Sequence, residues 1–434
     1  MSFEDAPIDA ASAERLARSG LELRLVDRTD QAAFDAWLQA DNRGFHDPAD
    51  DPAGLAEVRA HQPSRRTTGV YDPQGLIDEP VGTTQSWVAP LTVPGGAAVP
   101  LWSIASVTVA PTHRRRGIAR ALLESELRTA AADGQPIAGL TASEATLYGR
   151  YGFGVATFGE TTEIETARVR WTGPDAPGRT RFADPAALLP EALAIIDRLR
   201  AVQPGAIAYD DFKVGLAIGL YGRDRARVRA VRYADAAGVP QGFAAYSLSP
   251  DPRDFTKHTV TVRALLGATD EATAALWRFL LELDLVATVR AADRPVDEVV
   301  NWQLGDLRAA RRTRADRLWL RILDLPVALE ARRYAAPAAV VLEVDDPLGF
   351  AAGRFLLEVG PDGTGRVQPL AGEAPRGAAS VALPIAELSA IYLGGVAPVT
   401  LARAGRIAEL TPGAALVLER AFAAERAPWM TLEF

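Results

Sequence analysis

The sequence predicts a mixed α+β protein of more than one domain, and three observations lead to that prediction. The chain has 434 residues, more than one ordinary hydrophobic core organises. Hydrophobic residues make up 48% of it, a content typical of folded globular proteins. Strand and helix patterns both occur, and their texture changes near residues 165 and 323. We therefore expect three domains, over residues 1–165, 166–323 and 324–434.

Composition and charge exclude several classes of protein. The formal net charge of −8 argues against general affinity for nucleic acid. The chain has no cysteine and four scattered histidines, so thiolate chemistry is excluded and we expect no metal site. We find no run of about 18 apolar residues. Residues 1–20 also lack the pattern of a signal peptide, so we expect a cytoplasmic protein that makes no membrane contact.

Helices and strands alternate in the first region. The expected elements are a helix over residues 13–20, a strand over 21–26, a helix over 30–45, strands over 81–93 and 98–109, a helix over 116–134 and a strand over 136–143. Phe34, Trp37 and Leu38 share one face of the second helix, as helical spacing requires. The amphipathic helix that follows the two long strands ends at Gly134, a common helix stop.

The second and third regions also contain both kinds of element. The second is expected to hold helices over residues 185–201 and 270–284 and strands over 226–235, 242–249 and 258–268. The third is expected to hold helices near residues 326–331 and 384–395, strands over 338–346, 353–359 and 366–370, and a short helix before the C-terminus. The glycines of residues 360–365 lie between two strands with no helix after them, so they predict a hairpin turn and not a nucleotide loop.

The segment over residues 106–120, SVTVAPTHRRRGIAR, combines features that suit a pyrophosphate group. A β-branched strand ends at Val109, and the helix behind the loop begins with unpaired N–H groups and a partial positive charge. Gly117 leaves that helix end open to close approach, and arginines surround it. An arginine run alone is typical of a solvated loop, but the strand before it and the helix after it favour phosphate binding.

VTVAPTHRRRGIAR resembles motif A of the GNAT superfamily of N-acetyltransferases, and ASEATLYGRYGFGVAT resembles the Eis (enhanced intracellular survival) family within it. The Eis resemblance extends to LWLRILDLPVALEARRY, LEVDDP, LSAIYLGG and a terminal phenylalanine. It implies two tandem GNAT-like domains followed by a sterol-carrier-like α/β domain. It also implies acetyl-CoA as co-substrate and a homohexamer. The acidic start of the helix over residues 270–284 agrees with a second domain that has no coenzyme site, because negative charge there repels pyrophosphate.

The resemblance also implies a coenzyme site around the strand end and the helix start. Its residues are Val107, Thr108 and Val109 along the pantetheine, Arg115, Arg116, Gly117, Ile118, Ala119 and Arg120 at the phosphates, and Ser143 and Glu144 at the end of the next strand. A Ser-Glu pair at a strand end is most often a helix cap, and only its place in the motif adds it to this set.

Tyr148 is the candidate acid. A phenol beside the coenzyme sulfur can protonate the leaving thiolate, and the Eis resemblance implies a catalytic tyrosine in this position of the motif. Tyr151 is the alternative, and Phe153 extends the aromatic cluster. The resemblance further implies that the α-carboxylate of Phe434 acts as base. With a pKa of about 3.5 it is a weak one, better suited to orienting a water or stabilising an ammonium.

We therefore expect an acetyl-CoA-dependent N-acetyltransferase that modifies amines of polycationic acceptors. The resemblance implies aminoglycosides, polyamines or lysine side chains. Residues expected to line the acceptor pocket are Asp35, Trp37, Asp41, Phe45 and Glu433. One alternative is a non-catalytic CoA- or ligand-binding sensor or sequestering protein, and another is a lipid carrier acting through residues 324–434. The intact phosphate segment and Tyr148 favour the enzyme.

Overall fold

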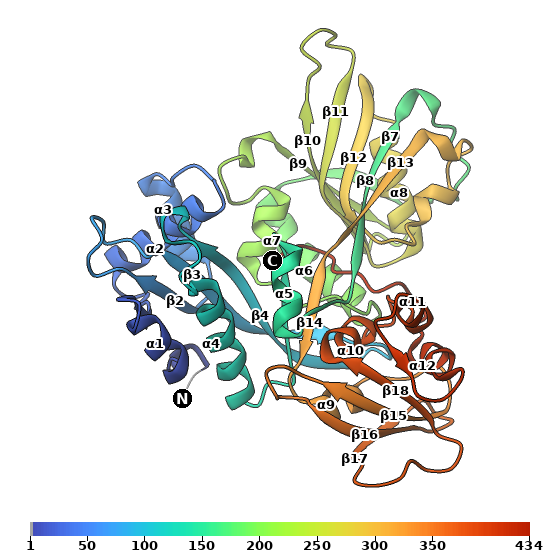
Figure 1. Ribbon diagram of the computed structural model, residues 1–434. Coiled ribbons are helices and arrows are strands. Elements are labelled where there is room, and N and C mark those ends of the chain that lie inside the picture. The colour runs from blue at the N-terminus through green and yellow to red at the C-terminus, as the bar shows by residue number, and fades with distance from the viewer. Residues whose placement is uncertain (1–2) are drawn as a thin grey trace.

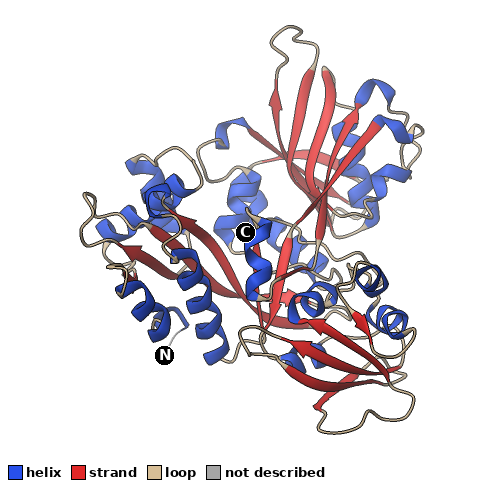
Figure 2. Ribbon diagram, in the orientation of Figure 1, coloured by secondary structure: helices blue, strands red, loops and turns tan. Residues whose placement is uncertain are grey.

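The computed structural model describes residues 3–434, and its strands form three sheets with helices packed against them (Figures 1 and 2). The first sheet contains, in spatial order, β1 (Glu22–Leu25), β2 (Arg66–Tyr71), β3 (Gly82–Thr92), β4 (Ala98–Val109), β5 (Ile137–Thr141), β14 (Leu318–Ile322) and β6 (Gly154–Val155). Its neighbours run antiparallel except β4 and β5, which run parallel and are joined through a helix.

The second sheet repeats this plan, and the third has its own. The second contains β13 (Ala310–Asp316), β7 (Phe158–Glu165), β12 (Val286–Arg294), β11 (His258–Gly267), β10 (Pro240–Ser249), β9 (Val228–Ala234) and β8 (Arg179–Ala183), with β11 and β12 as its parallel pair. The third contains β17 (Gly365–Pro369), β16 (Gly353–Val359), β15 (Ala338–Asp345), β18 (Ala379–Pro384) and β19 (Ala408–Glu409). Two related sheets followed by a third of different order confirm the predicted fold class.

Many helices begin at aspartates whose side chains accept backbone N–H groups of the first turn, as at Asp30 and Asp324. The helices are α1 (Ala10–Ala17), α2 (Gln31–Gly44), α3 (Pro52–His61), α4 (Ile118–Ala132), α5 (Ala145–Tyr148), α6 (Pro185–Arg200), α7 (Asp211–Ile218), α8 (Asp270–Leu281), α9 (Leu325–Ala331), α10 (Ile385–Ile391), α11 (Pro398–Arg403) and α12 (Ala414–Phe422). Phe34, Trp37 and Leu38 are buried together on α2, as their spacing predicts. None of the helices within residues 3–434 is long and apolar enough to cross a membrane.

The chain crosses between sheets twice. β7 precedes the expected boundary at residue 165 but belongs to the second sheet, and β14 precedes the boundary at residue 323 but completes the first. One cluster of buried apolar side chains also joins β14 to the third sheet and to α10 and α12. The three expected domains therefore share structure at both boundaries, and the first sheet requires a strand from late in the chain (Figure 1).

Candidate active site

The parallel strands β4 and β5 separate in the middle of the first sheet. Their pairing runs from Leu101 opposite Ile137 to Ile104 opposite Leu140, while β4 continues to Val109 beside β3 alone. A parallel pair that separates exposes the backbone of one strand to a wedge-shaped opening. α4 starts beside this opening, since it directly follows the loop after β4.

A bulge in β4 changes the direction of its side chains beyond this point. The register with β3 shifts between Thr83 and Gln85, and Ser106 on the facing strand has φ of 57°. Thr83 stabilises the bulge, because its Oγ1 donates a 2.8 Å hydrogen bond to the carbonyl of Ser106. A left-handed conformation at a serine costs on the order of 1 kcal/mol, and such bulges often re-aim side chains at functional sites.

The N-terminus of α4 has the form of an anion-binding site. Gly117 occupies its N-cap position with φ of 79°, where a glycine is favoured, and it provides no side-chain cap for the first N–H groups. A Cβ built on Gly117 would meet no described atom within 4 Å, so the space in front of the helix is open. Ile118, Ala119 and Arg120 follow as the first residues of α4. The predicted phosphate-binding residues are thus gathered at one helix end.

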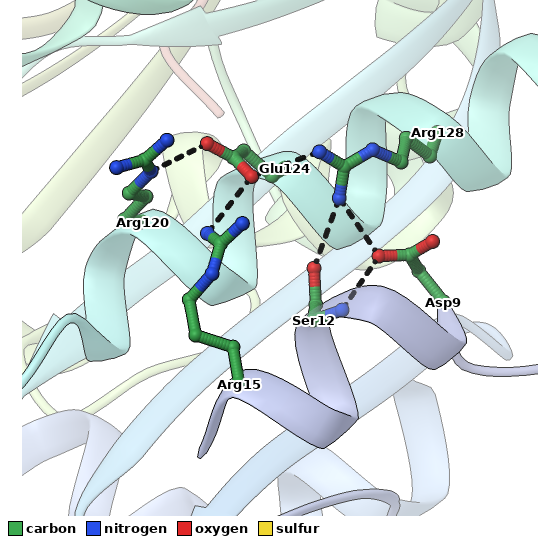
Figure 3. Close-up of polar contacts among 6 residues, drawn as sticks. All are labelled: Asp9, Ser12, Arg15, Arg120, Glu124 and Arg128. Atoms are coloured by element: carbon green, nitrogen blue, oxygen red, sulfur yellow. Dashed lines mark hydrogen bonds and ion pairs between the residues drawn. The ribbon is translucent and has the colours of Figure 1, made fainter. Parts of the chain in front are cut away.

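The arginines around this end are held to different degrees. Arg116 donates a 2.8 Å hydrogen bond to the carbonyl of Ser19, and Arg120 donates one of 2.6 Å to Glu124. Figure 3 shows Glu124 accepting hydrogen bonds from Arg15 and Arg128 as well as from Arg120. The Arg120 side chain is therefore held by a contact within the protein.

Arg115, by contrast, is an exposed residue with φ of 63°, two residues before Gly117. Arg114 lies 3.8 Å from Glu144, an ion pair that joins the loop before α4 to the segment before α5. The predicted phosphate-binding arginines therefore differ in how much freedom they have to reach a ligand.

A cavity of about 260 Å³ occupies the opening between the strands. Its wall consists of Phe45, Ile104, Ala105, Ser106, Val107, Leu140, Thr141, Ser143, Tyr148, Glu433 and Phe434. Both predicted catalytic residues lie in this wall. Of the other predicted coenzyme residues, Val107 and Ser143 line the cavity, whereas the Oγ1 of Thr108 is 2.6 Å from that of Thr83 and Val109 packs against α4.

Tyr148 ends the short helix α5, and its side chain is buried with its ring against Phe153 and Trp319. Burial raises the pKa of its phenol, and the negative charge of Glu144 acts in the same direction. The tyrosine therefore stays protonated over the neutral range. Tyr151 lies outside the cavity wall, which distinguishes it from Tyr148.

The C-terminal segment is held inside the protein. Residues 429–432 are buried, and the backbone N–H of Leu432 donates a 2.9 Å hydrogen bond to the Tyr209 hydroxyl. The hydroxyl of Thr141 donates a 3.1 Å bond to the backbone oxygen of Phe434. The Phe434 ring packs edge-on against Trp87 at a centroid distance of 5.3 Å. Residues of β3, of β5 and of the loop before α7 thus fix the last residue in the cavity that Tyr148 lines. Figure 1 shows the C-terminus next to α5.

The residues expected at the acceptor pocket divide into two groups. Asp41 reaches the cavity through a hydrogen bond from Ser106, and Phe45 and Glu433 line it directly. Asp35 instead forms an ion pair with Arg59, and Trp37 is fully buried in the core beneath α2. The expectation that Asp35 and Trp37 line this cavity is therefore wrong.

The equivalent opening in the second sheet differs from the first in its charged residues. β11 and β12 also separate, and Arg294 lines the opening, where it donates a 2.6 Å hydrogen bond to the carbonyl of Leu265 and pairs with Glu298. The Thr269 side chain caps α8, and Asp270 and Glu271 add negative charge there. A cavity of about 330 Å³ on this side contains Glu433 in its wall. Within residues 3–434, no cluster of three or more acidic or histidine side chains is suited to a metal ion.

Sequence reasoning missed several residues of the site. Ser106, Thr141 and Tyr209 belong to no motif, and each acts through a contact with a distant segment. The position of Thr141 at the end of an expected strand is the one signal that could have drawn attention to it. Nothing in the sequence around Tyr209 indicates that it binds the C-terminal segment.

Comparisons with known proteins agree with this architecture. Two family models of an acetyltransferase (GNAT) domain match residues 26–156 and 219–322, and a sterol carrier protein domain model matches residues 325–431. An uncharacterized N-acetyltransferase of Streptomyces coelicolor is 36% identical over 94% of this chain and 98% of its own length. N-acetyltransferase Eis of Mycobacterium tuberculosis is 33% identical over 88% of this chain and 93% of its own length. The crystal structure of Eis1 from Mycobacterium abscessus superimposes with a TM-score of 0.78 at 29% identity, over 95% of this chain and 100% of that one.

Proposed function

The chain belongs to the Eis family of N-acetyltransferases, and we propose that it transfers the acetyl group of acetyl-CoA to amines of polycationic molecules. Acetyl-CoA supplies an activated thioester. The observation that carries the proposal is that Tyr148 and Phe434 line one cavity between separated parallel strands, beside the open end of α4.

The residues at the start of α4 suit the coenzyme. N–H groups without a side-chain cap, the open space at Gly117 and the exposed Arg115 together form a cradle for phosphate oxygens. The backbone of Val107, in the cavity wall, suits the amide groups of a pantetheine arm. Ser143 and Glu144 complete the proposed site on the opposite side of the opening.

Charge supports a cationic acceptor. Glu433 and the α-carboxylate of Phe434 belong to residues of the cavity wall, and Asp41 lies behind Ser106. Negative groups around a small cavity attract ammonium groups and raise their local concentration. Aminoglycosides, polyamines and lysine side chains share this multiple positive charge. Phe45 adds an aromatic surface at the same place.

Two residues carry the proposed chemistry. The Tyr148 phenol stays protonated because burial raises its pKa, so it can donate a proton to the departing sulfur. The Phe434 carboxylate stabilises the positive charge of the acceptor amine and orients it. The non-catalytic alternative has no observation in its favour.

The test is a measurement of CoA release from acetyl-CoA with a panel of polyamines and aminoglycosides. A thiol reagent reports only CoA in this assay, since the chain contains no cysteine. We expect release that depends on the acceptor and saturates with it, and mass spectrometry should find N-acetylated product. Tight binding of acetyl-CoA without transfer to any polyamine or aminoglycoside would overturn the proposed acceptor class.

We further propose three domains over residues 1–165, 166–323 and 324–434, with β7 and β14 exchanged between the first two, and a homohexamer, following the Eis resemblance. Light scattering of the purified chain tests the hexamer. A monomeric mass in solution would contradict it.

A further inference from the structure

Asp41 near the end of α2 carries a carboxyl group that the fold satisfies only in part. Its Oδ2 accepts a 3.1 Å hydrogen bond from the Ser106 hydroxyl. Its Oδ1 is sealed from solvent and has no hydrogen-bond partner within the described part of the chain. An unsatisfied buried carboxyl oxygen is unfavourable for stability, so its presence calls for a functional explanation.

Ser106 connects this carboxyl group to the cavity. Its Oγ donates to Asp41 and accepts a 2.8 Å hydrogen bond from Gln85 Nε2. A hydroxyl has one proton to donate and two lone pairs to accept with, so one lone pair is left for a further donor. Ser106 lines the cavity together with Tyr148 and Phe434, so an amine bound in the cavity lies beside the Ser106 side chain.

We propose that Ser106 and Asp41 form the route by which the acceptor amine loses its proton, an inference that rests on the proposed function. The bound ammonium donates an N–H to Ser106 Oγ. Its extra proton moves to Ser106 while the serine proton moves to Asp41 Oδ2, and Asp41 releases that proton to solvent, which leaves a neutral amine. The amine nitrogen then attacks the thioester carbonyl, and as the new C–N bond forms it loses a second proton through Ser106 to Asp41. The C–S bond breaks, and the sulfur takes the proton of Tyr148. The proton held by Asp41 then passes to solvent and Tyr148 is reprotonated, which balances the reaction.

The surroundings of Asp41 suit this role. Burial raises its pKa to about 7, and the negative charge of Asp47 acts in the same direction, while the hydrogen bond from Ser106 opposes them. β3 and β4, which pack against α2, contain no charged residue. Two other charged side chains of α2 are paired, in the ion pairs Arg59–Asp35 and Arg43–Glu79, and the remaining facing groups are Glu433 and the C-terminal carboxylate.

The pKa also decides between the two available bases. A proton leaving an amine of pKa about 10 moves uphill by about three powers of ten to reach Asp41, but by more than about six to reach an α-carboxylate of pKa about 3.5. Asp41 is therefore the better acceptor for the proton, and Phe434 remains the group that holds the ammonium. Ser106 touches the acceptor, and Asp41 is a positioning residue that acts through it.

The first test compares Asp41→Asn, Ser106→Ala and the double variant by kcat/KM over a range of pH, with Asp35→Asn as matched control on the same helix. We expect kcat/KM of each single variant to be about 100-fold lower than that of the wild type. The double variant should be no slower than either, because both residues serve one route. The kcat/KM of the wild-type and control enzymes should fall as pH falls through 7. The kcat/KM of Asp41→Asn should not show this fall.

The second test separates proton removal from acceptor binding. A fluorinated polyamine has a weakly basic amine that arrives without its extra proton, so Asp41→Asn should lose no more than about tenfold with it. If Asp41→Asn lost as much kcat/KM with the fluorinated polyamine as with the unfluorinated one, the proposal would be overturned. A wild-type enzyme inactive with every amine would instead overturn the proposed function, and this inference with it.

A third readout needs no substrate. Since the pKa of Asp41 is raised in the folded state, the folded protein binds more protons than the unfolded one between about pH 4 and 7. As pH rises from about 4 to about 7, the wild-type melting temperature should therefore fall relative to that of Asp41→Asn. Parallel melting profiles would contradict a buried, titrating Asp41.

Discussion

The hydroxyl of Thr141 donates a 3.1 Å hydrogen bond to the backbone oxygen of Phe434, although 293 residues separate them in the chain. Thr141 ends β5, one of the two strands that separate at the cavity. The bond therefore sets the position of the last residue from the same strand that shapes the opening. Trp87 packs against the Phe434 ring, and Tyr209 accepts a hydrogen bond from the backbone N–H of Leu432.

Removal of Phe434 tests this arrangement. Deletion moves the terminal carboxylate to Glu433 and removes the ring that packs against Trp87. We expect kcat/KM to fall by about 100-fold or more, because the acceptor loses its electrostatic partner. The dissociation constant of acetyl-CoA should change little, since α4 lies elsewhere. A C-terminal extension should have the same effect and an N-terminal extension should not. Full activity after deletion would contradict a role for the terminus.

Tyr148→Phe and Tyr151→Phe form a second comparison. Both tyrosines belong to the same motif, but only Tyr148 lines the cavity. We expect kcat of Tyr148→Phe to fall by about 100-fold or more with unchanged acetyl-CoA binding, and Tyr151→Phe to stay within a few fold. Because burial raises the Tyr148 pKa, no loss of wild-type activity due to this group should occur below about pH 10. Equal effects of the two variants would contradict the assignment.

Gly117 and Gly134 lie just beyond opposite ends of α4, with φ of 79° and 76°, and a Cβ on either would meet no described atom within 4 Å. Alanine at each position should cost about 1 kcal/mol of folding stability through strain alone. Only Gly117→Ala should also raise the KM for acetyl-CoA, because only that end presents N–H groups to the phosphates. A similar KM for the two variants would argue against the proposed phosphate site.

Much of the fold follows from sequence patterns. The stripe of α2, the strand pair around Gly95 and Gly96, and the glycine stop of α4 all depend on neighbouring residues, so local periodicity predicts them. β14 could not be placed in the first sheet in this way, because its partners β5 and β6 lie more than 150 residues earlier. Strand exchange is a tertiary property that local patterns do not encode.

The site divides in the same manner. The residues over 107–120 and Tyr148 follow from a motif in which strand, loop and helix are contiguous. The sequence predicts Asp41 only as a residue of the acceptor pocket, and its burial and its hydrogen bond from Ser106 required the structure. Trp37 shows the opposite error, since an aromatic residue near an expected pocket proved to be core.

The third sheet is tied to the active site by a buried ion pair. Arg321 on β14 and Asp346 after β15 have no exposed side-chain surface, and their atoms lie 2.6 Å apart. The Arg321 Nε also donates a 2.7 Å hydrogen bond to the carbonyl of Tyr151, just after the helix that carries Tyr148. Loss of the pair should therefore disturb both stability and catalysis.

We predict that Asp346→Asn destabilises the protein by about 3–5 kcal/mol at pH 7, because it leaves the Arg321 guanidinium buried without its partner. Burial acts to raise the pKa of Asp346, but the hydrogen bond and charge of Arg321 outweigh it and hold that pKa below its usual value. A lowered folded-state pKa stabilises the protein above the unfolded pKa of about 4, and this contribution is lost as pH falls through the folded value. Denaturant unfolding should therefore show the difference between wild type and Asp346→Asn shrinking in acid. The double variant Arg321→Met with Asp346→Leu, which removes both charges, should be more stable than Asp346→Asn alone. A single variant as stable as the wild type at pH 7 would contradict a structural role for the pair.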